Sequence, residues 1–305
     1  MRKKKLKIFF KNRGHFASLP GDNLVREHCI DKKGRSTMNN TNFIIHEPAD
    51  EYHARSRSGE FMSSHLLADF RESPALYRRK VSGEITESES SAFVMGRAAH
   101  CLILEGRNAF DREYVVTDGP INPRTGESYG RNTKAFAEWA ATQEREIISG
   151  KDFSFLLKLQ RGVWLHPIAS ELLADGIAEG VVRAEYCSVP CQIRMDWFSM
   201  KSGLVDLKTC DSLRWFESDC RRYGYIPQLA FYRAILRIVS GKNFPVHIIA
   251  VEKNEPFSAG VWKLTDELLD LAELSNKSAL ERFRACCISG VWPTGYEDLR
   301  IIDTL

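Results

Sequence analysis

The chain has 305 residues, of which 43% are apolar and 27% charged, and its formal net charge is +3. This composition is that of a globular protein rather than a disordered or fibrous chain, and the length is enough to bury a substantial core. The small net charge does not by itself identify a nucleic-acid partner. No apolar run approaches the ~20 residues that span a bilayer, so we expect a cytoplasmic protein with no membrane segment.

The first 55 residues or so differ from the rest of the chain, because they are basic, polar and poor in hydrophobic periodicity. We expect a disordered N-terminal arm over residues 1–55, whose lysines and arginines could contact DNA phosphates. Met38 offers a second possible start within this arm. Residues 56–305 are expected to form a single domain.

The first half of that domain is predicted to be mainly helical. Helices are expected over 63–70, from Ser73-Pro74 onward, and over 91–104, 133–148 and 154–174. Serine is a favoured helix cap, and proline is tolerated in the first turn. Between the helices we expect a strand at 114–117, and a loop rich in glycine and proline over 120–132.

The second half predicts a sheet. Strands are expected over 180–188, 191–200, 204–209, 246–251 and 259–264, and helices over 212–222, 226–239 and from Thr265 to about 289. The turn Lys201-Ser202-Gly203 predicts a hairpin between the second and third of these strands. The order of elements indicates an α/β fold in which a central mixed sheet is flanked by helices.

The strand Val205-Asp206-Leu207-Lys208-Thr209 is the most informative stretch of the sequence. Side chains alternate along a strand, so Asp206 and Lys208 project from the same face. Burying a charge is costly unless it is paired or binds a metal. This pairing suits metal-assisted phosphodiester cleavage, with a lysine beside the attacking water.

Further carboxylates are expected nearby. Asp196 lies on the partner strand and Glu185 on the strand before it, so three acids could converge on a hard cation that prefers oxygen ligands. The D-x-K triplet alone is weak, because Asp31-Lys32-Lys33 also matches it. The alternative is that Lys208 and one of the acids form a purely structural salt bridge.

Three other polar residues occur in apolar surroundings. Gln228 and Tyr232 are four residues apart, hence on one face of an expected buried helix, and buried polar groups need partners. They could meet Lys208 or a bound phosphate, or simply bond to each other. His100 ends a run of small and apolar residues, where a histidine is more often a core residue than a ligand.

Taken together, these residues resemble the PD-(D/E)XK nuclease superfamily, and in particular the RecE-type (exonuclease VIII-like) exonucleases of phages and prophages. The resemblance covers about residues 63–293. It rests on an entry helix pair at Ser63-Ser64 to Pro74, a G-x-x-x-H helix at Gly96 to His100, acidic positions at Glu185 and Asp196, a D-x-K-T strand at Asp206 to Thr209, and a Y-x-x-Q-x-x-x-Y helix at Tyr225 to Tyr232.

The resemblance implies a PD-(D/E)XK core and a role for each matching residue. Asp196 and Asp206 would bind Mg²⁺, which Mn²⁺ could replace, and His100 and the backbone carbonyl of Leu207 would complete the coordination. Lys208 would orient or activate water. Gln228 and Tyr232 would support Lys208 or the scissile phosphate, and Glu185 would stand at an acidic position whose role varies in the family.

The resemblance also implies an activity and partners. The activity would be exodeoxyribonuclease digestion of linear double-stranded DNA from its ends, 5′ to 3′, in phage-type recombination. The partners would be DNA ends, further copies of the chain in a toroidal homo-oligomer, and a single-strand-annealing recombinase.

Two other interpretations remain open. A helicase-linked or CRISPR-linked nuclease of the same superfamily commonly carries four cysteines around an iron–sulfur cluster, whereas Cys286 and Cys287 are adjacent here and no C-x-x-C series follows. The chain could also be a catalytically inert DNA-binding module, against which the acids and Lys208 argue.

Overall fold

A mixed five-stranded sheet lies at the centre of the computed structural model, which describes residues 41, 43–86 and 91–302. In spatial order its strands are β3 (Ile177–Tyr186), β4 (Val189–Ser199), β5 (Gly203–Cys210), β6 (Val246–Glu252) and β7 (Ala259–Leu264). Only β5 and β6 are parallel; the other neighbouring strands are antiparallel. The predicted α/β class with a central mixed sheet is therefore confirmed.

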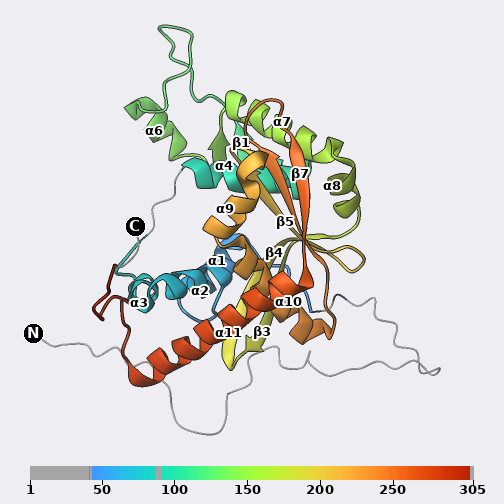
Figure 1. Cartoon of the computed structure of the whole chain (residues 1–305). Helices are drawn as coiled ribbons and strands as arrows, with labels where there is room; N and C mark the ends of the chain where they lie inside the picture. Colours follow the sequence, from blue (N-terminus) through green and yellow to red (C-terminus); the bar gives the residue numbers. More distant parts are fainter. Residues whose placement is uncertain (1–40, 42, 87–90, 303–305) are drawn as a thin grey trace, which may run out of the picture. The chain divides into compact units, whose positions relative to one another are not determined.

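Helices cover both faces of this sheet (Figure 1). One face packs against α2 (Ser64–Glu72), α3 (Pro74–Val81), α9 (Phe216–Arg222), α10 (Tyr225–Ser240) and α11 (Asp266–Ser289). The other packs against α4 (Ser91–His100), the π-helical turn η2 (Cys101–Glu105), α5 (Arg107–Glu113), α7 (Gly150–Leu165) and α8 (Pro167–Leu172). A short 3₁₀ turn, η3 (Leu213–Trp215), precedes α9.

Strand β5 is buried on both of its faces. Leu204 belongs to the core on the α10 side, whereas Val205 and Leu207 belong to the core on the α7 side. A strand covered on both faces reads as a nearly continuous apolar run. Asp206 and Lys208 interrupt that run and, by alternation, share the α10 side with Leu204.

The predicted helix starts are confirmed by their caps. The hydroxyl groups of Ser63, Ser73 and Thr265 accept hydrogen bonds from the backbone N–H of Leu66, Leu76 and Leu268. Each cap satisfies a donor that the first turn of a helix leaves without an intrahelical partner.

The predicted boundary of the N-terminal arm at residue 55 is too late. Helix α1 (Ala49–Arg57) already forms part of the domain, and Ile45 pairs with Val181 of β3. The buried amide of Gln192 donates hydrogen bonds to Tyr52 O and Ser56 Oγ, at 2.9 and 2.8 Å. Residues 1–40 of the predicted arm lie outside the described residues.

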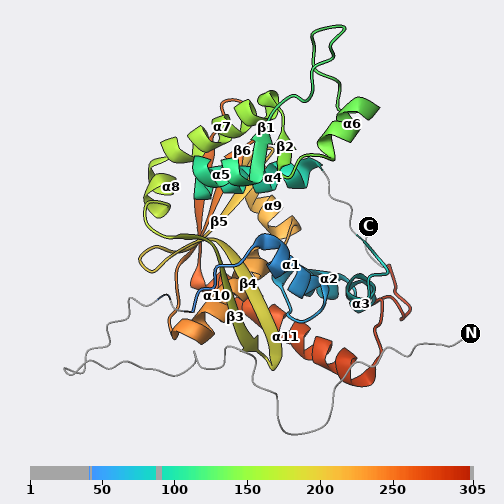
Figure 2. The same cartoon turned by 180° about the vertical axis from the view of Figure 1, so that it is seen from behind.

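Two helix predictions in the first half are also corrected. Within 133–148, α6 (Lys134–Ala140) is short, and β2 (Glu146–Ile148) pairs in parallel with β1 (Tyr114–Val116) in a separate two-stranded sheet (Figure 2). The stretch 154–174 is divided at His166, because the residue before Pro167 is driven out of the helical conformation. No helix of the described part of the chain has the length and apolar character needed to span a bilayer.

Candidate active site

Strands β4 and β5 separate at Asp196. Their ladder registers only the pairs from Trp197↔Val205 to Ser199↔Gly203, and the next pair in register would have been Asp196 opposite Asp206. Instead, the Asp196 side chain enters the gap, and its Oδ2 accepts a hydrogen bond from the Leu207 backbone N–H at 2.8 Å. The carboxylate thereby satisfies a donor that the ladder leaves free, and this bond holds Asp196 beside β5.

The two-residue turn between β3 and β4 places Glu179, and not the expected Glu185, opposite Asp196. Cys187 and Ser188 both have positive φ, 52° and 57°, and close the β3–β4 hairpin. The resulting register places Glu179, between the pairs Ala178↔Trp197 and Gly180↔Met195, across from Asp196. Glu179 itself has φ 55°, a conformation that costs a non-glycine residue on the order of 1–3 kcal/mol and is enriched at functional sites.

Three side chains converge at this point. His100, Glu179 and Asp196 each offer one metal-ligating atom, and these atoms all lie within 4.8 Å of one another. His100 comes from the end of α4, and its Nδ1 lies 3.6 Å from Asp196 Oδ2. The His100 ring also interacts with the backbone of Leu207, so the expected metal-binding residues His100, Asp196 and Leu207 are neighbours.

Glu185 is not part of this group. It is exposed and pairs with Pro190 beside the hairpin turn, six residues along β3 from Glu179. At about 3.3 Å per strand residue that separation is on the order of 20 Å. The structure therefore places Glu179, which our sequence analysis missed, where an acid from β3 was expected.

Asp206 and Lys208 form a buried ion pair next to the group. Lys208 Nζ lies 2.7 Å from Asp206 Oδ2, and the Asp206 residue is 1% exposed. Burial raises the pKa of Asp206, the Lys208 charge opposes that shift and Asp196 adds to it. Burial alone would lower the pKa of Lys208, but Asp206 and Asp196 outweigh it and raise this pKa, so the lysine stays protonated.

The N-terminal half of α10 faces this ion pair. Gln228 Nε2 donates a long hydrogen bond of 3.4 Å to the Tyr232 hydroxyl. Burial raises the pKa of Tyr232 to about 12, and the nearby charges of Asp196 and Asp206 contribute to the rise. Lys208 Nζ lies 4.9 Å from the centre of the Tyr225 ring. Tyr232 therefore lies within electrostatic range of both acids, and Gln228 lies beside Tyr232.

The site has the properties of a divalent-cation site. Asp206 Oδ2 faces the Lys208 ammonium, whereas the buried Oδ1 has no hydrogen-bond partner among the described residues, which leaves it lone pairs for a ligand. Burial, and next Asp196, raise the pKa of Glu179 to about 8, even though the nearby Arg194 opposes the shift. Carboxylate and carbonyl oxygens with one imidazole fit Mg²⁺ or Mn²⁺.

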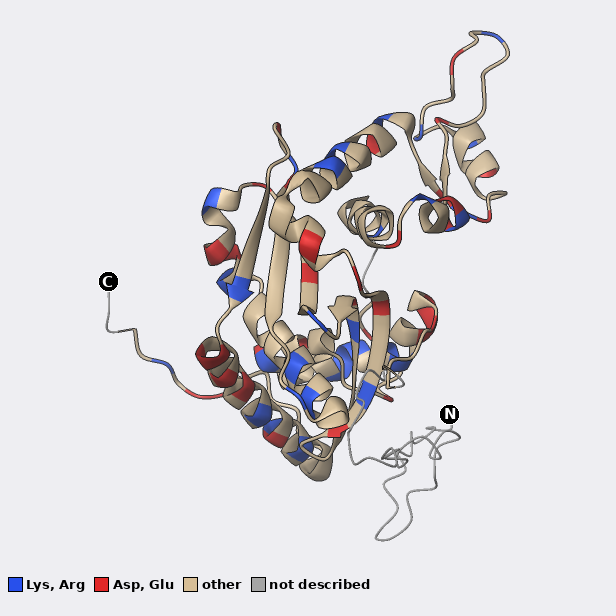
Figure 3. Ribbon diagram, turned by 90° about the vertical axis from the view of Figure 1, so that its right-hand side faces the viewer, with Lys and Arg blue, Asp and Glu red and all other residues tan. Residues whose placement is uncertain are grey.

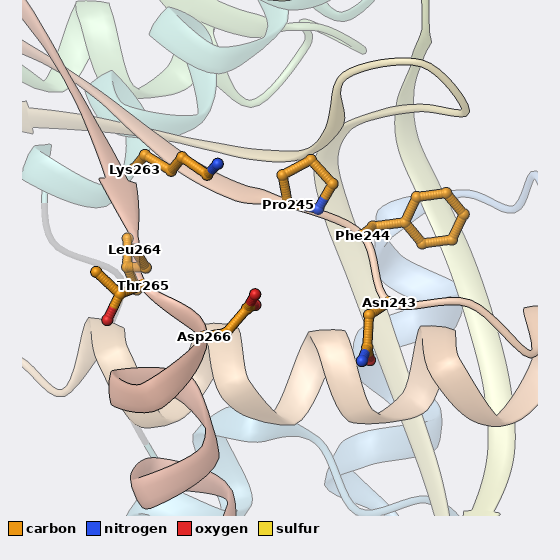
Figure 4. A pocket seen from close by; sticks show the side chains of 7 residues that line it. All are labelled: Asn243, Phe244, Pro245, Lys263, Leu264, Thr265 and Asp266. Carbon is orange, nitrogen blue, oxygen red and sulfur yellow. The ribbon is translucent and has the colours of Figure 1, made fainter.

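Neither charge distribution nor concavity alone singles out this site. Lysines and arginines are interspersed with acids over the described part of the chain (Figure 3). A surface depression between the start of β6 and the end of β7 is lined by Asn243, Phe244, Pro245, Lys263, Leu264, Thr265 and Asp266 (Figure 4). None of the expected site residues lines it, so the chemistry of the acid cluster identifies the candidate site better than shape.

The comparisons with known proteins agree with this geometry. Residues 63–303 match the family described as "PDDEXK-like domain of unknown function (DUF3799)". The fold is similar to the crystal structure of a "Putative exonuclease" from Eubacterium rectale, with a TM-score of 0.61 and 17% identity over 85% of this chain and 97% of that one. At that identity the likeness supports the fold alone. No curated protein matches the chain.

Proposed function

Because the chain belongs to the family of PDDEXK-like domains (DUF3799), we propose that it is a metal-dependent nuclease that hydrolyses phosphodiester bonds of DNA. The observation that carries the proposal is the convergence of His100, Glu179 and Asp196 beside the buried pair of Asp206 and Lys208. A protein that only bound DNA would gain little from burying these acids, because they repel phosphate.

The acids and His100 would hold the cation, together with the backbone carbonyl of Leu207. When bound, a divalent cation neutralises phosphate charge and lowers the pKa of coordinated water. Asp196 is held in place by the Leu207 N–H, and Glu179 by Arg194, whose Nε lies 3.1 Å from Glu179 Oε2. Such contacts orient ligands before the cation arrives.

Lys208 would act on the nucleophile and the phosphate. Its ammonium group stays charged, and the ion pair with Asp206 restricts its position. From there it would hydrogen-bond the attacking water or a phosphate oxygen and stabilise the charge that develops there. Gln228 and Tyr232 would hold the phosphate from the α10 side.

The finer assignment is a RecE-type exodeoxyribonuclease that digests linear duplex DNA from its ends, 5′ to 3′, in phage-type recombination. The ordered motifs from Gly96 to Tyr232 support it. As part of this proposal we place the enzyme in the cytoplasm, as a toroidal homo-oligomer that hands its product to a single-strand-annealing recombinase.

The test is digestion of end-labelled linear duplex DNA beside a covalently closed circle of the same sequence. We expect loss of the linear DNA with Mg²⁺ or Mn²⁺, no cleavage in EDTA, little turnover with Ca²⁺, and an intact circle. Asp196→Asn, which keeps the side chain's size, should abolish cleavage. Full activity in EDTA would contradict the metal mechanism, cleavage of the circle would contradict the exonuclease assignment, and binding without cleavage would indicate an inert module.

A further inference from the structure

Two neighbouring tyrosine rings, with a cation at each end, lead from the buried site to the surface. Lys208 Nζ lies 4.9 Å from the centre of the Tyr225 ring, and the rings of Tyr225 and Tyr223 are 5.9 Å apart at an angle of 33°. Arg222 Cζ lies 5.3 Å from the centre of the Tyr223 ring. Only one aromatic ring therefore separates Tyr223 from the site lysine.

The link between α9 and α10 produces this arrangement. Gly224 has φ 71°, a conformation that glycine adopts readily and that most other residues avoid. Tyr223 caps the C-terminal end of α9 and Tyr225 begins α10, so their rings lie together. Tyr225 is half-buried against Phe216, whereas Tyr223 is 57% exposed.

An exposed tyrosine paired with an arginine is common on protein surfaces and does not by itself indicate a binding site. Tyr223 differs because it continues the contacts that position Lys208. A ring in this place can stack on any nucleobase, since every base has a π-face. The neighbouring guanidinium of Arg222 can bind a phosphate.

We propose that Tyr223 and Arg222 form a subsite for an unpaired nucleotide of the strand being cut. Tyr223 would stack on its base and Arg222 would bind its phosphate, next to the phosphate at Lys208. This inference rests on the proposed nuclease function and adds a preference for frayed or single-stranded ends. A base within a blunt duplex is already stacked and paired, so it would not be available to Tyr223.

The surrounding charges predict how such a subsite behaves. Glu217 and Asp219 lie on the same short helix as Arg221 and Arg222, so the local net charge is small. Base stacking on Tyr223 should therefore contribute more to nucleotide binding than the net electrostatic attraction of this surface. Losing the ring should weaken binding at every salt concentration alike, whereas losing Arg222 should also flatten the salt dependence.

The test measures binding of the full chain to fluorescein-labelled dT12 and to a blunt hairpin duplex by fluorescence anisotropy in Ca²⁺. The variants are Tyr223→Ala, Tyr223→Phe and, as a matched control, Tyr296→Ala. Tyr296 is 71% exposed and carries Arg300 over its ring at 4.1 Å, but it lies near the C-terminus. Tyr223→Ala should weaken dT12 binding about tenfold, in the range for loss of one base stack.

Tyr223→Phe keeps the ring and should bind dT12 within about twofold of wild type, as should Tyr296→Ala, and blunt-duplex binding should change little in all three. The subsite is refuted if wild type does not bind dT12, or if Tyr223→Ala binds dT12 as tightly as wild type. It is also refuted if Tyr223→Phe or Tyr296→Ala loses as much dT12 affinity as Tyr223→Ala. Cleavage in Mg²⁺ is scored separately, so an inactive wild type would refute the nuclease without deciding the subsite.

Discussion

At the scale of single residues, the ion pair of Asp206 and Lys208 separates a catalytic from a structural interpretation of β5. Both side chains are largely buried, with 2% and 17% of their surface exposed. Removing one partner of such a pair leaves an uncompensated charge, which costs about 3–5 kcal/mol unless the remaining group is neutralised. Stability alone therefore cannot tell the two interpretations apart, but catalysis under conditions that restore stability can.

We predict that Lys208→Ala lowers the single-turnover cleavage rate about a thousandfold, roughly 4 kcal/mol of transition-state stabilisation. Thermal stability should also fall without metal and recover with Mg²⁺, because a cation can replace the lost charge beside Asp206. Cleavage at saturating Mg²⁺ and melting with and without Mg²⁺ measure the two effects. Lys201→Ala, at the exposed β4–β5 turn, is the control. Retention of more than about a tenth of the rate would refute a catalytic role for Lys208.

Matched substitutions at Glu179 and Glu185 test which glutamate of β3 binds the metal at the candidate site. Glu179→Gln should weaken Mn²⁺ binding by at least tenfold, about 1.4 kcal/mol, because a carboxylate ligand becomes a neutral amide. Glu185→Gln makes the same chemical change at an exposed position away from the cluster and should bind Mn²⁺ like wild type. Isothermal titration calorimetry measures both. Equal losses in the two variants, or none in either, would show that Glu179 is not a ligand.

At the scale of elements, the hairpin turn decides which acid enters the site. The sequence suggested that β3 ran to Ser188, which would place the turn two residues later than it is. With that later turn, Arg183 would lie opposite Asp196 and Glu185 would be two residues further along β3. With the observed turn, Glu179 lies opposite Asp196. Cys187-Ser188 lacks the glycine or asparagine typical of such turns, so the signal was not recognisable.

Helix α1 provides a prediction at the same scale. Gln192 of β4 is fully buried and bonds to α1 at Tyr52 O and Ser56 Oγ, while its Oε1 accepts from Arg183 Nε at 3.2 Å. Gln192→Ala should therefore lower the free energy of unfolding by about 2 kcal/mol or more, because buried partners lose their hydrogen bonds. Urea denaturation gives the value, and the control is Gln143→Ala, at a half-buried position where the amide bonds to the neighbouring Thr142 hydroxyl. A loss no larger than that of the control would mean that α1 docks without this contact.

At the scale of the whole molecule, the acid cluster should make stability depend on pH and metal. The pKa of Glu179 is raised to about 8, and that of Asp206 is raised as well, so the folded state favours their protonated forms. Ionisation above these pKa values then favours unfolding, and stability contributed by these groups is lost as pH rises from their unfolded values through their folded ones.

We therefore predict that Mg²⁺ raises the melting temperature more at pH 8.5 than at pH 6, because protons and the cation compete for the same carboxylates. Differential scanning fluorimetry over a series of Mg²⁺ concentrations measures the shift. In Asp196→Asn, the pH dependence of the Mg²⁺ effect should shrink. A Mg²⁺ effect independent of pH would argue against binding at Glu179 and Asp206.

The sequence by itself determined the class of fold and most of the candidate site. Apolar periodicity, capping serines and the order of elements are local signals, so they predicted the central strands, α10 and α11. The pair Asp206 and Lys208 could be recognised from the sequence, because charges in an apolar strand are costly unless they are paired or bind a metal. Gln228 and Tyr232 could be assigned to one face from their spacing alone.

Only the tertiary structure decided which residues meet. His100, Glu179 and Asp196 come from a helix end and two strands, and their separation depends on hairpin register and helix packing rather than on local sequence. A shift of two residues in the turn replaces Glu179 by Arg183 opposite Asp196 without changing any strand's pattern, because side chains two apart share a face. The inclusion of α1 in the domain was likewise decided by long-range bonds to Gln192, which no local periodicity encodes.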